Sequence, residues 1–442
     1  MTTDGDSQGQ DGGAAVEPAA WSRVEAALEE LRPTYIRALS TLVGHASTIG
    51  RETDAQRFIA ALATQAGLET DLWDVDPAVV ARDPRSGRAD GGEMPRPNLT
   101  ATLRGTGGGR SLAVSGHVDV VPAEPLGLWS RDPWGGSIEG DRLYGRGALD
   151  MKGGLLAGLH AVHAIRAAGV RLRGDVLYES VIEEECTGNG TLAARLRGPR
   201  VDGAIITEPS GAEYGAPGSR EEIRIATPGV IWFELTVSGK PAYVGLAGRS
   251  VNAIDLAVGL IAALKSLPDE FNAAFRHPAF DGHPRPLTLN VGTISGGNWP
   301  SNVPLECRVG FRLSFPLGWT VAQAQAAVEA RIADACAGDP WLRDHPPAIR
   351  YHGFRSTGWS IQPGASIVQA LAQSYRTVAG GEAGIAPAFG TADARFFGDE
   401  GIPAAFFGPL GADLHAPDEF VSLESCHLVA RVVAHAILRW CA

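Results

Sequence analysis

Short apolar runs of strand length alternate with helix-patterned segments along this 442-residue chain, and this alternation constrains the fold more than any other feature. The runs NLTATL, SLAVSG, DVLYESVI and DGAIITE are separated by helical patterns at 151–168 and near 191–196. The alternation returns after residue 358, with helical patterns at 365–379 and 423–440 around the run PAAFFG. Continuous apolar strands that alternate with helices are typical of a sheet covered on both faces. The sequence therefore predicts an α/β fold with a mostly parallel sheet.

The pattern changes between residues 227 and 356. A strand VIWFELTVSG, a helix at 251–267, the strands PLTLNVGTI and LECRVGFRLSF, a helix at 321–337 and a strand AIRYHGF follow one another there. This βαββαβ order is that of the ferredoxin-like split unit. We therefore expect an inserted ferredoxin-like α+β domain at 227–356, within a larger domain formed by residues 21–226 and 357–442.

The composition limits the partners of the chain. Its 38 Lys and Arg residues against 50 Asp and Glu residues give a formal net charge of −12, whereas nucleic acids and anionic membranes attract clustered positive charge. Five scattered cysteines without a CxxC pair argue against a disulfide framework. Residues 1–20 are acidic and rich in Gly, which predicts a disordered tail and no signal peptide. We expect a cytoplasmic protein with no nucleic-acid or membrane partner.

Acidic and imidazole side chains stand where the predicted strands end or in neighbouring loops. They are His117, Asp119, Asp150, Glu183, Glu184, Glu185, Glu208 and His415. Open α/β sheets place their active sites at the carboxyl ends of parallel strands, and imidazole with carboxylate suits Zn, Mn or Co in a catalytic site. The spacing leaves ordinary alternatives open, such as a structural histidine, a solvated glutamate face, or Asp150 as a helix cap. Taken together, the residues predict a metal site.

Six segments resemble the motifs of the M20 metallopeptidase family, the amidohydrolases that include acetylornithine deacetylase, succinyl-diaminopimelate desuccinylase, aminoacylase and glutamate carboxypeptidase. They are SGHVDVVP at 115–122, GRGALDMKGG at 145–154, EEECTGNGT at 183–191, ITEPSG at 206–211, GTADARFF at 390–397 and HAPDEF at 415–420. The C-terminal part looks most similar to the acetylornithine deacetylase and formylaminopyrimidine deformylase branch. The resemblance implies that the inserted domain is a lid that carries the contact of a homodimer.

The resemblance also implies a metal-binding role for five residues. Asp150 would bridge two divalent ions, with zinc the first expectation and manganese or cobalt the alternatives. His117 and Glu208 would complete one metal site. Glu185 and His415 would complete the other site.

The resemblance also implies a catalytic role for two further residues. Glu184 would be the general base toward a metal-activated water and would pass the proton to the leaving amine. Asp119, two residues after His117, would orient the imidazole from behind. The position of Glu183 is often Asp in the family.

Substrate anchoring by the large domain rests on the segment GTADAR. The resemblance implies that Thr391 and Arg395 hold the substrate, with the guanidinium on a carboxylate. An internal ion pair of Arg395 with Asp393 or Glu419 is the structural alternative.

The lid contributes further candidates and one departure from the family. Asn302 matches the family's Asn in an N-V-P turn, and Arg312 is a second candidate anchor at a shorter interval than the family usually has. In SGKPAYVG, Tyr243 replaces the lid histidine that stabilises the oxyanion in the partner subunit's site. Either the Tyr243 hydroxyl donates that hydrogen bond, or His277 or His283 takes the role, or the substrate is unusual.

Three functions compete. The leading hypothesis is a hydrolase of non-peptide linear amide C–N bonds, a metal-dependent amidohydrolase that deacylates a small N-acylated amine or amino acid. A metallo-carboxypeptidase or dipeptidase of the same family is the alternative, as is hydrolysis of another C–N bond such as that of an aromatic amine. A metal-binding pseudoenzyme is supported only by Tyr243 and is opposed by the intact Glu184.

Overall fold

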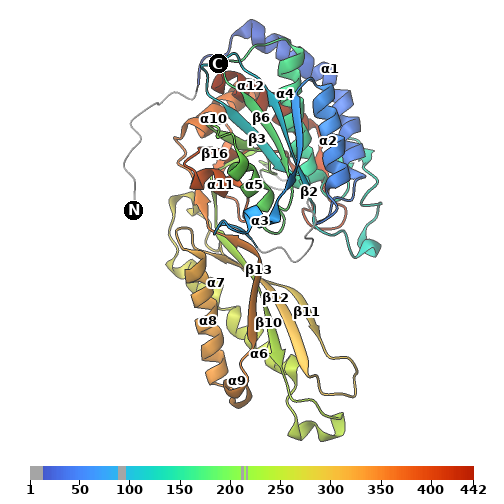
Figure 1. Ribbon diagram of the computed structural model, residues 1–442, viewed down its shortest axis with the longest axis vertical. Helices are drawn as coiled ribbons and strands as arrows, with labels where there is room; N and C mark the ends of the chain where they lie inside the picture. The colour runs from blue at the N-terminus through green and yellow to red at the C-terminus, as the bar shows by residue number, and fades with distance from the viewer. Residues whose placement is uncertain (1–12, 88–95, 211–213, 216–217) are drawn as a thin grey trace.

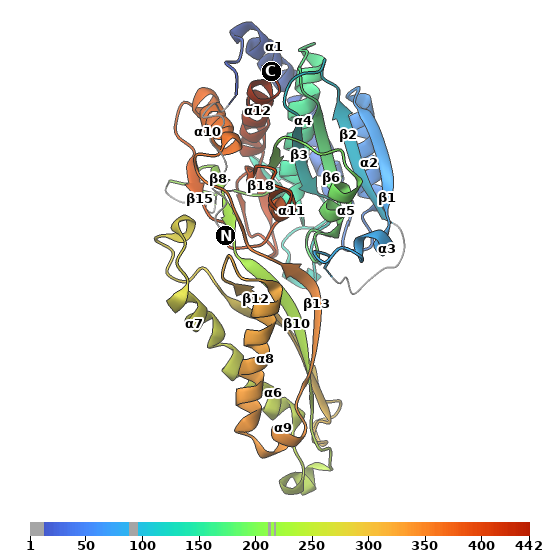
Figure 2. The same ribbon diagram turned by 60° about the vertical axis from the view of Figure 1, so that its left-hand side comes forward.

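A computed structural model describes residues 13–87, 96–210, 214–215 and 218–442, which form a large and a small unit lying end to end (Figures 1 and 2). The large unit contains an eight-stranded sheet and the small unit a four-stranded sheet. The chain passes between the units at β9 (Ala226–Thr227) and β14 (Trp359–Ser360), which pair antiparallel. We call residues 13–228 and 357–442 the large unit and residues 229–356 the small unit.

The eight-stranded sheet has the order β1-β2-β6-β3-β7-β16-β8-β15. Its strands are β1 (Glu69–Val75), β2 (Arg96–Leu103), β3 (Leu112–His117), β6 (Val176–Val181), β7 (Ala204–Ile206), β8 (Glu222–Arg224), β15 (Gly384–Ala386) and β16 (Ala404–Phe406). The central strands β6, β3, β7 and β16 are parallel, and so are β8 and β15. However, β2 is antiparallel to β1 and β6, and β8 is antiparallel to β16.

The expectation of an α/β fold is confirmed, but this sheet is mixed. The prediction of a mostly parallel sheet is wrong for its flanks. An apolar run indicates that a strand is buried but not in which direction it runs, because the same side chains are buried either way.

Helices cover both faces of this sheet (Figure 1). They are α1 (Pro18–Val43), α2 (Thr53–Gln65), α3 (Pro77–Val80), α4 (Gly154–Ala167), α5 (Asn189–Arg197), α10 (Ser366–Ala379), α11 (Ala394–Asp399) and α12 (Leu423–Trp440). Successive residues of a strand point to opposite faces, so Val114 and Ile205 join the main core, whereas Ala113 and Ile206 join a second cluster. Because α4 lies between the sheet and α1 and α12, it is buried on nearly every side.

The N-terminal segment differs from the prediction. Helix α1 begins at Pro18 and not after residue 20. The Ala14 amide donates a hydrogen bond to the Arg439 carbonyl at 3.0 Å, and the Arg439 guanidinium donates to the Gly13 carbonyl at 3.2 Å. The predicted disordered tail at 1–20 is therefore wrong for residues 13–20, while residues 1–12 lie outside the described part of the chain.

The small unit has the sheet order β11-β12-β10-β13 and the chain order that the sequence predicts. Its elements are β10 (Gly229–Ser238), α6 (Ala253–Leu264), α7 (Leu267–Ala274), β11 (Leu289–Gly296), β12 (Glu306–Phe315), α8 (Val321–Ala337), α9 (Pro340–Asp344) and β13 (Ala348–Ser356). Alternate residues of β10, among them Phe233 and Leu235, are buried in the core under α6 and α8. The helix predicted at 251–267 is observed as α6 and ends at Leu264. A separate helix, α7, begins at Leu267 with Pro268 in its first turn, where proline is favoured.

A second four-stranded sheet of the large unit has the order β17-β18-β5-β4. Its strands are β4 (Ser137–Glu139), β5 (Arg142–Tyr144), β17 (Gly411–Ala412) and β18 (Phe420–Ser422). The remaining short helical turns are η1 (Leu126–Leu128), η2 (Ala148–Gly153), η3 (Val244–Arg249) and η4 (Pro278–Phe280). This sheet joins the segment before Asp150 to the segment after His415, because β5 pairs with β18.

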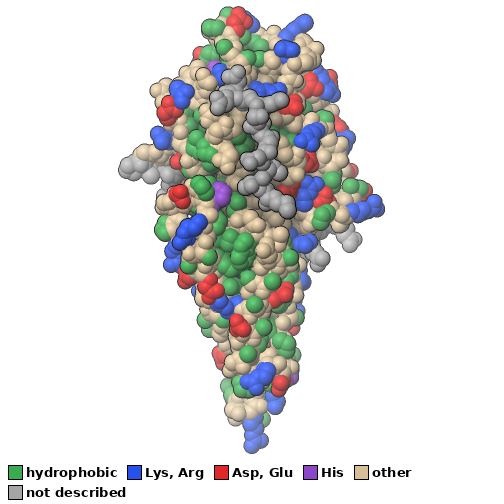
Figure 3. Space-filling view, turned by 90° about the vertical axis from the view of Figure 1, so that its left-hand side faces the viewer, with side chains coloured by type: hydrophobic (Ala, Val, Ile, Leu, Met, Phe, Trp, Pro, Cys, Tyr) green, Lys and Arg blue, Asp and Glu red, His purple; other side chains and the backbone are tan. Residues whose placement is uncertain are grey.

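The surface in Figure 3 carries Lys and Arg side chains interspersed with Asp and Glu, and hydrophobic side chains gather on the small unit near its junction with the large unit. A face of mixed charge does not form the continuous positive patch to which nucleic acids bind. None of the helices in the described ranges is long and apolar enough to cross a membrane.

Candidate metal centre

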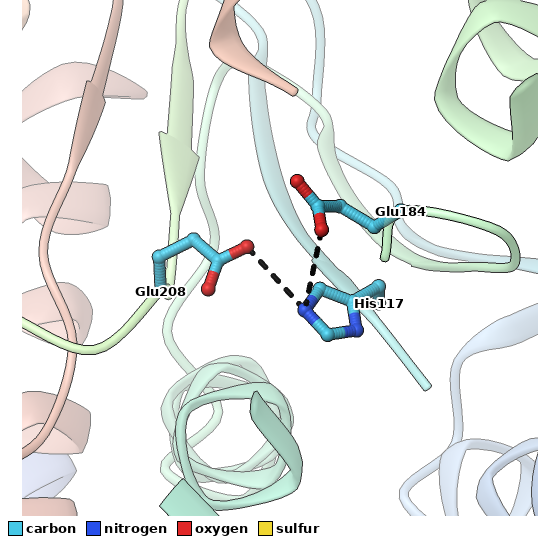
Figure 4. A group of neighbouring side chains, drawn as sticks. All are labelled: His117, Glu184 and Glu208. Carbon is cyan, nitrogen blue, oxygen red and sulfur yellow. Dashed lines mark ion pairs between the residues drawn. The ribbon is translucent and has the colours of Figure 1, made fainter. Parts of the chain in front are cut away.

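Three neighbouring parallel strands bring acidic and imidazole groups to one edge of the sheet. β3 ends at His117, a turn carrying Glu184 follows β6, and Glu208 lies two residues beyond β7. The side chains of these three residues point toward one another (Figure 4). His117 Nε2 lies 3.5 Å from Glu208 Oε1 and 3.9 Å from Glu184 Oε2. Parallel pairing places all three at one edge, because the carboxyl ends of parallel strands coincide.

Asp150 stands between two imidazoles. Its Oδ1 is 3.2 Å from His117 Nε2, and its Oδ2 is 3.1 Å from His415 Nε2. Glu185 Oε1 lies 3.3 Å from His415 Nε2 on the far side. The structure therefore brings the five residues predicted as metal ligands into one cluster together with Glu184.

Two glycines let the backbone close around this cluster. A Cβ added to Gly154, the first residue of α4, would lie 1.8 Å from the Thr207 carbonyl oxygen. A Cβ added to Gly408 would lie 2.1 Å from the Glu208 carbonyl oxygen. Only glycine permits these close approaches, which pack α4 and the segment after β16 against the end of β7.

The carboxylates of this cluster repel one another in a buried place. Burial raises the pKa values of Glu184, Glu185 and Glu208, and repulsion from neighbouring carboxylates raises them further. Burial lowers the pKa of His117, but the charge of Glu208 and the hydrogen bond to Asp150 outweigh it and raise the value. Because such groups are rarely buried without a counter-charge, the cluster is suited to positive charge at its centre.

The donor atoms suit divalent metal ions. His117, Glu184 and Glu208 offer ligand atoms that lie within 4.8 Å of one another, and so do His117, Asp150 and Glu185. Glu184 Oε1 is buried and has no hydrogen-bond partner among the described residues. Imidazole and carboxylate ligands without thiolate are the set that Zn, Mn and Co take in catalytic sites. The residues present therefore fit divalent metal ions, and His117 belongs to both groups.

Asp119 contacts His117 through its backbone. The Nδ1–H of His117 lies 2.8 Å from the backbone carbonyl oxygen of Asp119, whereas the nearest carboxylate oxygen is 3.7 Å away. The Asp119 carboxylate instead accepts hydrogen bonds from the backbone amides of Glu184 at 3.2 Å and Glu185 at 3.0 Å. Asp119 therefore contacts the imidazole through its carbonyl oxygen, and the Nε2 atom of His117 faces the cluster.

Glu419 is a residue whose role the sequence did not reveal. It is fully buried, pairs with Arg146 at 2.5 Å, and accepts hydrogen bonds from the amides of Leu149 at 2.9 Å and Asp150 at 3.1 Å. It therefore fixes the backbone that presents the Asp150 carboxylate. The motif HAPDEF contains Glu419, but nothing in its spacing indicates that it turns toward residues 146–150.

Arg395, a candidate anchor of the large unit, lies beside Asp393 and Glu184. Arg395 is buried and donates to the Thr187 carbonyl at 2.7 Å. Its predicted alternative partner Glu419 is bound to Arg146 instead, so that alternative is wrong. The other alternative partner, Asp393, accepts a hydrogen bond from Thr191 Oγ1 at 2.6 Å. Across the described ranges, Arg395 forms no ion pair within 4.0 Å, but the charge of Asp393 lies close enough to act on the guanidinium.

Thr391 joins the two units. Its hydroxyl oxygen lies 2.5 Å from Ser356 Oγ, at the end of β13. The GTADAR segment therefore meets the small unit at the point where the chain returns to the large unit.

The candidates of the small unit lie in two different places. Tyr243 forms a β-bridge with Asn302, and both residues are exposed, Tyr243 to 68%. Tyr243 directly precedes η3, which lies at the end of the small unit remote from the large unit (Figures 1 and 2). Arg312 is half-buried in β12, where it donates to Ser314 Oγ at 3.1 Å and burial lowers its pKa. Within one chain, the structure does not bring Tyr243 or Asn302 to the metal centre.

The two alternative histidines lie on the opposite side of the small unit. His277 and His283 line a cavity of about 310 Å³ with Phe275 and Phe280. The His283 ring packs edge-on against Phe389, just before the GTADAR segment, with centroids 5.0 Å apart.

Similarity to known proteins extends over nearly the whole chain. A sequence model of the peptidase family M20/M25/M40 matches residues 113–439. An N-formyl-4-amino-5-aminomethyl-2-methylpyrimidine deformylase of Bacillus subtilis (strain 168) is 28% identical over 440 residues, 94% of this chain and 96% of that protein. A succinyl-diaminopimelate desuccinylase of Methylocella silvestris is 30% identical over 415 residues, 92% of this chain and 98% of that protein. The dipeptidase Dug1p of Saccharomyces cerevisiae has a similar fold, with a TM-score of 0.79 at 14% identity over 96% of this chain and 99% of that chain.

Proposed function

The chain belongs to peptidase family M20/M25/M40, and from this premise we propose that it is a metal-dependent amidohydrolase that deacylates a small N-acylated amine or amino acid. One observation carries the proposal. The two oxygens of the Asp150 carboxylate each face an imidazole, 3.2 Å from His117 Nε2 and 3.1 Å from His415 Nε2. A carboxylate in this position is placed to bridge two divalent cations.

The proposed metal ligands divide into two sets around Asp150. His117 and Glu208 would hold one ion, and Glu185 and His415 the other. We assign zinc first, with manganese or cobalt as alternatives, because the set is imidazole and carboxylate without thiolate. Two bound ions would lower the pKa of water and polarise the amide carbonyl.

Glu184 is the proposed general base. Its Oε1 is buried without a hydrogen-bond partner among the described residues, and burial with repulsion from Glu208 raises its pKa. A carboxylate with a raised pKa is a stronger base toward water than an ordinary glutamate. Glu184 would therefore move the proton from the attacking water to the leaving amine. Asp119 positions it, because the Asp119 carboxylate accepts the amide of Glu184.

The proposed substrate class follows from the relatives. The two relatives named above act, by their names, on a formylated pyrimidine amine and a succinylated amino acid. Both are small amines that carry an acyl group. The alternative, a carboxypeptidase or dipeptidase, has the yeast dipeptidase in its favour, but 14% identity supports a common fold alone. A deacylase is therefore the first proposal, and hydrolysis of an aromatic amine's C–N bond stays compatible with it.

Arg395 and Thr391 are the proposed substrate anchors of the large unit. The Arg395 guanidinium lies close enough to Asp393 and Glu184 for these charges to interact with it. Arg395 is thus placed to hold a substrate carboxylate beside the base. Arg312 is a proposed second anchor in the small unit.

The small unit, residues 227–356 in the predicted boundaries, is the proposed lid and dimerisation domain. Its strand β11 is a sheet edge, and seven large apolar side chains of this unit are exposed. They are Tyr243, Val244, Leu246, Val258, Ile294, Trp299 and Leu305. An exposed apolar surface beside an open strand edge is typical of a subunit interface. A homodimer would also give Tyr243 and Asn302 a partner site to reach.

A cytoplasmic location is part of the proposal. Its support is the state of the cysteines, because all five are free and an oxidising compartment favours paired ones.

The decisive experiment compares two adjacent glutamates on one substrate panel. N-formyl, N-acetyl and N-succinyl amines and amino acids are assayed beside dipeptides with Zn²⁺, Mn²⁺ or Co²⁺. We expect turnover of an N-acyl compound, and a kcat lower by about 10²–10⁴-fold in Glu184→Gln at unchanged metal content. Glu185→Gln should instead lose bound metal. Faster turnover of dipeptides than of every N-acyl compound would favour the alternative. No turnover, with Glu184→Gln equal to wild type, would reject hydrolysis.

A further inference from the structure

A buried chain of charges lies behind the turn that carries Glu184 and Glu185. Arg96, the first residue of β2, donates to Glu52 Oε1 at 2.6 Å through one guanidinium nitrogen and forms an ion pair with Glu183 through the other. The side chains of Glu52, Arg96 and Glu183 are 0%, 7% and 7% exposed. Buried charges of this kind are costly unless they are paired. We call these three residues the rear triad.

The direction of β2 brings the rear triad to the metal centre. β2 and β6 pair antiparallel with Leu99 opposite Ser180. Continued by three residues toward the start of β2, this register sets Arg96 opposite Glu183. A parallel β2 would carry Arg96 to the other end of the sheet. The antiparallel flank therefore supplies a cation directly behind the residues that end β6.

Glu183 uses its whole length to shape this turn. Its backbone adopts a left-handed conformation, with φ of 63°, which non-glycine residues rarely adopt. Its Oε2 accepts a hydrogen bond from Thr187 Oγ1 at 2.8 Å, and its carbonyl accepts from the amides of Thr187 at 3.0 Å and Gly188 at 2.7 Å. Its other carboxylate oxygen is bound to Arg96. The side chain thus ties the turn to β2 and closes the turn on itself.

Glu184 and Glu185 are held from the opposite side by Asp119, whose carboxylate accepts both of their amides. The turn is therefore fixed between two buried anchors, Asp119 toward the metal centre and Arg96 behind it. Asp119 and Glu52 are close enough for the charge of Asp119 to raise the pKa of Glu52. Electrostatic interaction thus links Asp119 to Glu52, the residue that binds Arg96.

We propose that the rear triad of Glu52, Arg96 and Glu183 positions Glu184 and Glu185 without touching metal or substrate. It would thereby set the geometry of the base Glu184 and the affinity for the metal ion that Glu185 binds. This inference rests on the proposed function of Glu184 as base and Glu185 as ligand. Residues that orient ligands from behind change metal affinity or activity by about 10–100-fold when they are replaced. Glu183, Arg96 and Glu52 are positioning residues in this sense.

The test uses Glu183→Gln and Glu183→Asp in the full chain. Metal-free protein is titrated with Zn²⁺ against a chromophoric chelator, and kcat, KM and the thermal midpoint are measured on the same preparations. In Glu183→Gln we expect the Zn²⁺ affinity of the proposed site at Glu185 and His415 to fall about 10-fold. We expect kcat to fall about 10–100-fold, with KM within about 3-fold of the wild-type value. Glu183→Asp keeps the charge but is one methylene shorter, so it should recover part of both losses.

Glu179→Gln is the matched control. Like Glu183, Glu179 is buried in an ion pair with an arginine, here Arg195, but it lies inside β6 and not in the turn that follows this strand. It should lower the thermal midpoint and leave Zn²⁺ affinity and kcat unchanged. The inference is overturned if Glu183→Gln changes only the thermal midpoint, or if Glu179→Gln reduces Zn²⁺ affinity and kcat equally.

The two proposals fail in different ways. If the wild-type chain binds zinc but hydrolyses no substrate of the panel, the proposed function fails, and Zn²⁺ affinity alone decides on the rear triad. If the wild-type chain binds none of Zn²⁺, Mn²⁺ and Co²⁺, both proposals fail.

Discussion

The metal centre of the large unit and the exposed end of the small unit differ in how complete they are within one chain. Around Asp150, His117 and the carboxylates are mostly buried while His415 is 45% exposed, and Glu419 and Asp119 bind the backbone that presents Asp150 and Glu184. At the end of the small unit, Tyr243 is 68% exposed, and its recorded contact with Asn302 is a backbone bridge. A preorganised site needs such supports. The difference teaches that the large unit supports its candidate groups from within, whereas the small unit presents Tyr243 and Asn302 at the surface.

The largest effect is expected from removing metal from the centre of the large unit. Dialysis against a chelator should abolish hydrolysis, because repulsion among the carboxylates near Asp150 is left uncompensated and no group replaces the ions as electrophiles. Added Zn²⁺, Mn²⁺ or Co²⁺ should restore turnover. The same ions at 100 times their Kd should stabilise the fold by about 2.7 kcal/mol, as an increase in the thermal midpoint. Full activity in the chelated protein would contradict a metal centre.

Tyr243→Phe tests the exposed end of the small unit. If the phenol donates to the oxyanion in a partner's site, its loss should lower kcat by about 100-fold with little change in KM. Asn302→Ala should change KM more than kcat, because an anchor contributes to binding of the substrate in both states. Steady-state kinetics on the best substrate of the panel distinguishes the two variants. An unchanged kcat in Tyr243→Phe would remove this residue from the reaction.

A smaller effect is expected from separating the subunits. Leu305→Lys places a charge in the exposed apolar surface of the small unit, where Leu305 is 57% exposed, and should shift a dimer toward monomer in light scattering. Activity should fall by about 10-fold or more, since Tyr243 then has no partner site. Leu128→Lys is the control, because Leu128 is 66% exposed in the large unit. A monomeric wild-type chain with full activity would contradict the dimer.

The smallest effect concerns stability in acid. His160 of the large unit is buried, its Nε2–H donates to the Leu28 carbonyl at 3.0 Å, and burial lowers its pKa to about 3. The unfolded chain, with a histidine pKa of about 6.5, then binds more protons than the folded chain between about pH 6.5 and 3. The free energy of unfolding should therefore decrease as the pH is lowered through this window, by up to about 1.4 kcal/mol per pH unit.

Urea unfolding at pH 7 and pH 5 measures this loss. His160→Gln keeps a donor for the Leu28 carbonyl but does not titrate, so its stability should depend less on pH. An equal pH dependence in both proteins would show that His160 does not contribute.

The sequence predicted much of the secondary structure, because periodicity reports burial directly. α8 and α12 are observed at 321–337 and 423–440, and family membership is confirmed by the family match. The direction of β2 was missed, since a buried strand has the same composition whichever way it runs. This direction decides that Arg96 meets Glu183. The binding of Glu419 to the amide of Asp150 was missed for a related reason, as it joins residues 269 positions apart.

By itself, the sequence determined which chemical groups this protein has and that strand ends carry them: two imidazoles, an aspartate and a run of glutamates in family order. These properties are local, because a side chain's chemistry and its place at the end of an apolar run do not depend on the rest of the fold. Only the tertiary structure decided which atoms meet. It turned the Asp119 carbonyl, and not its carboxylate, toward His117, and it left Tyr243 at the surface. Contacts between distant segments depend on strand direction, register and packing, which are properties of the folded chain as a whole.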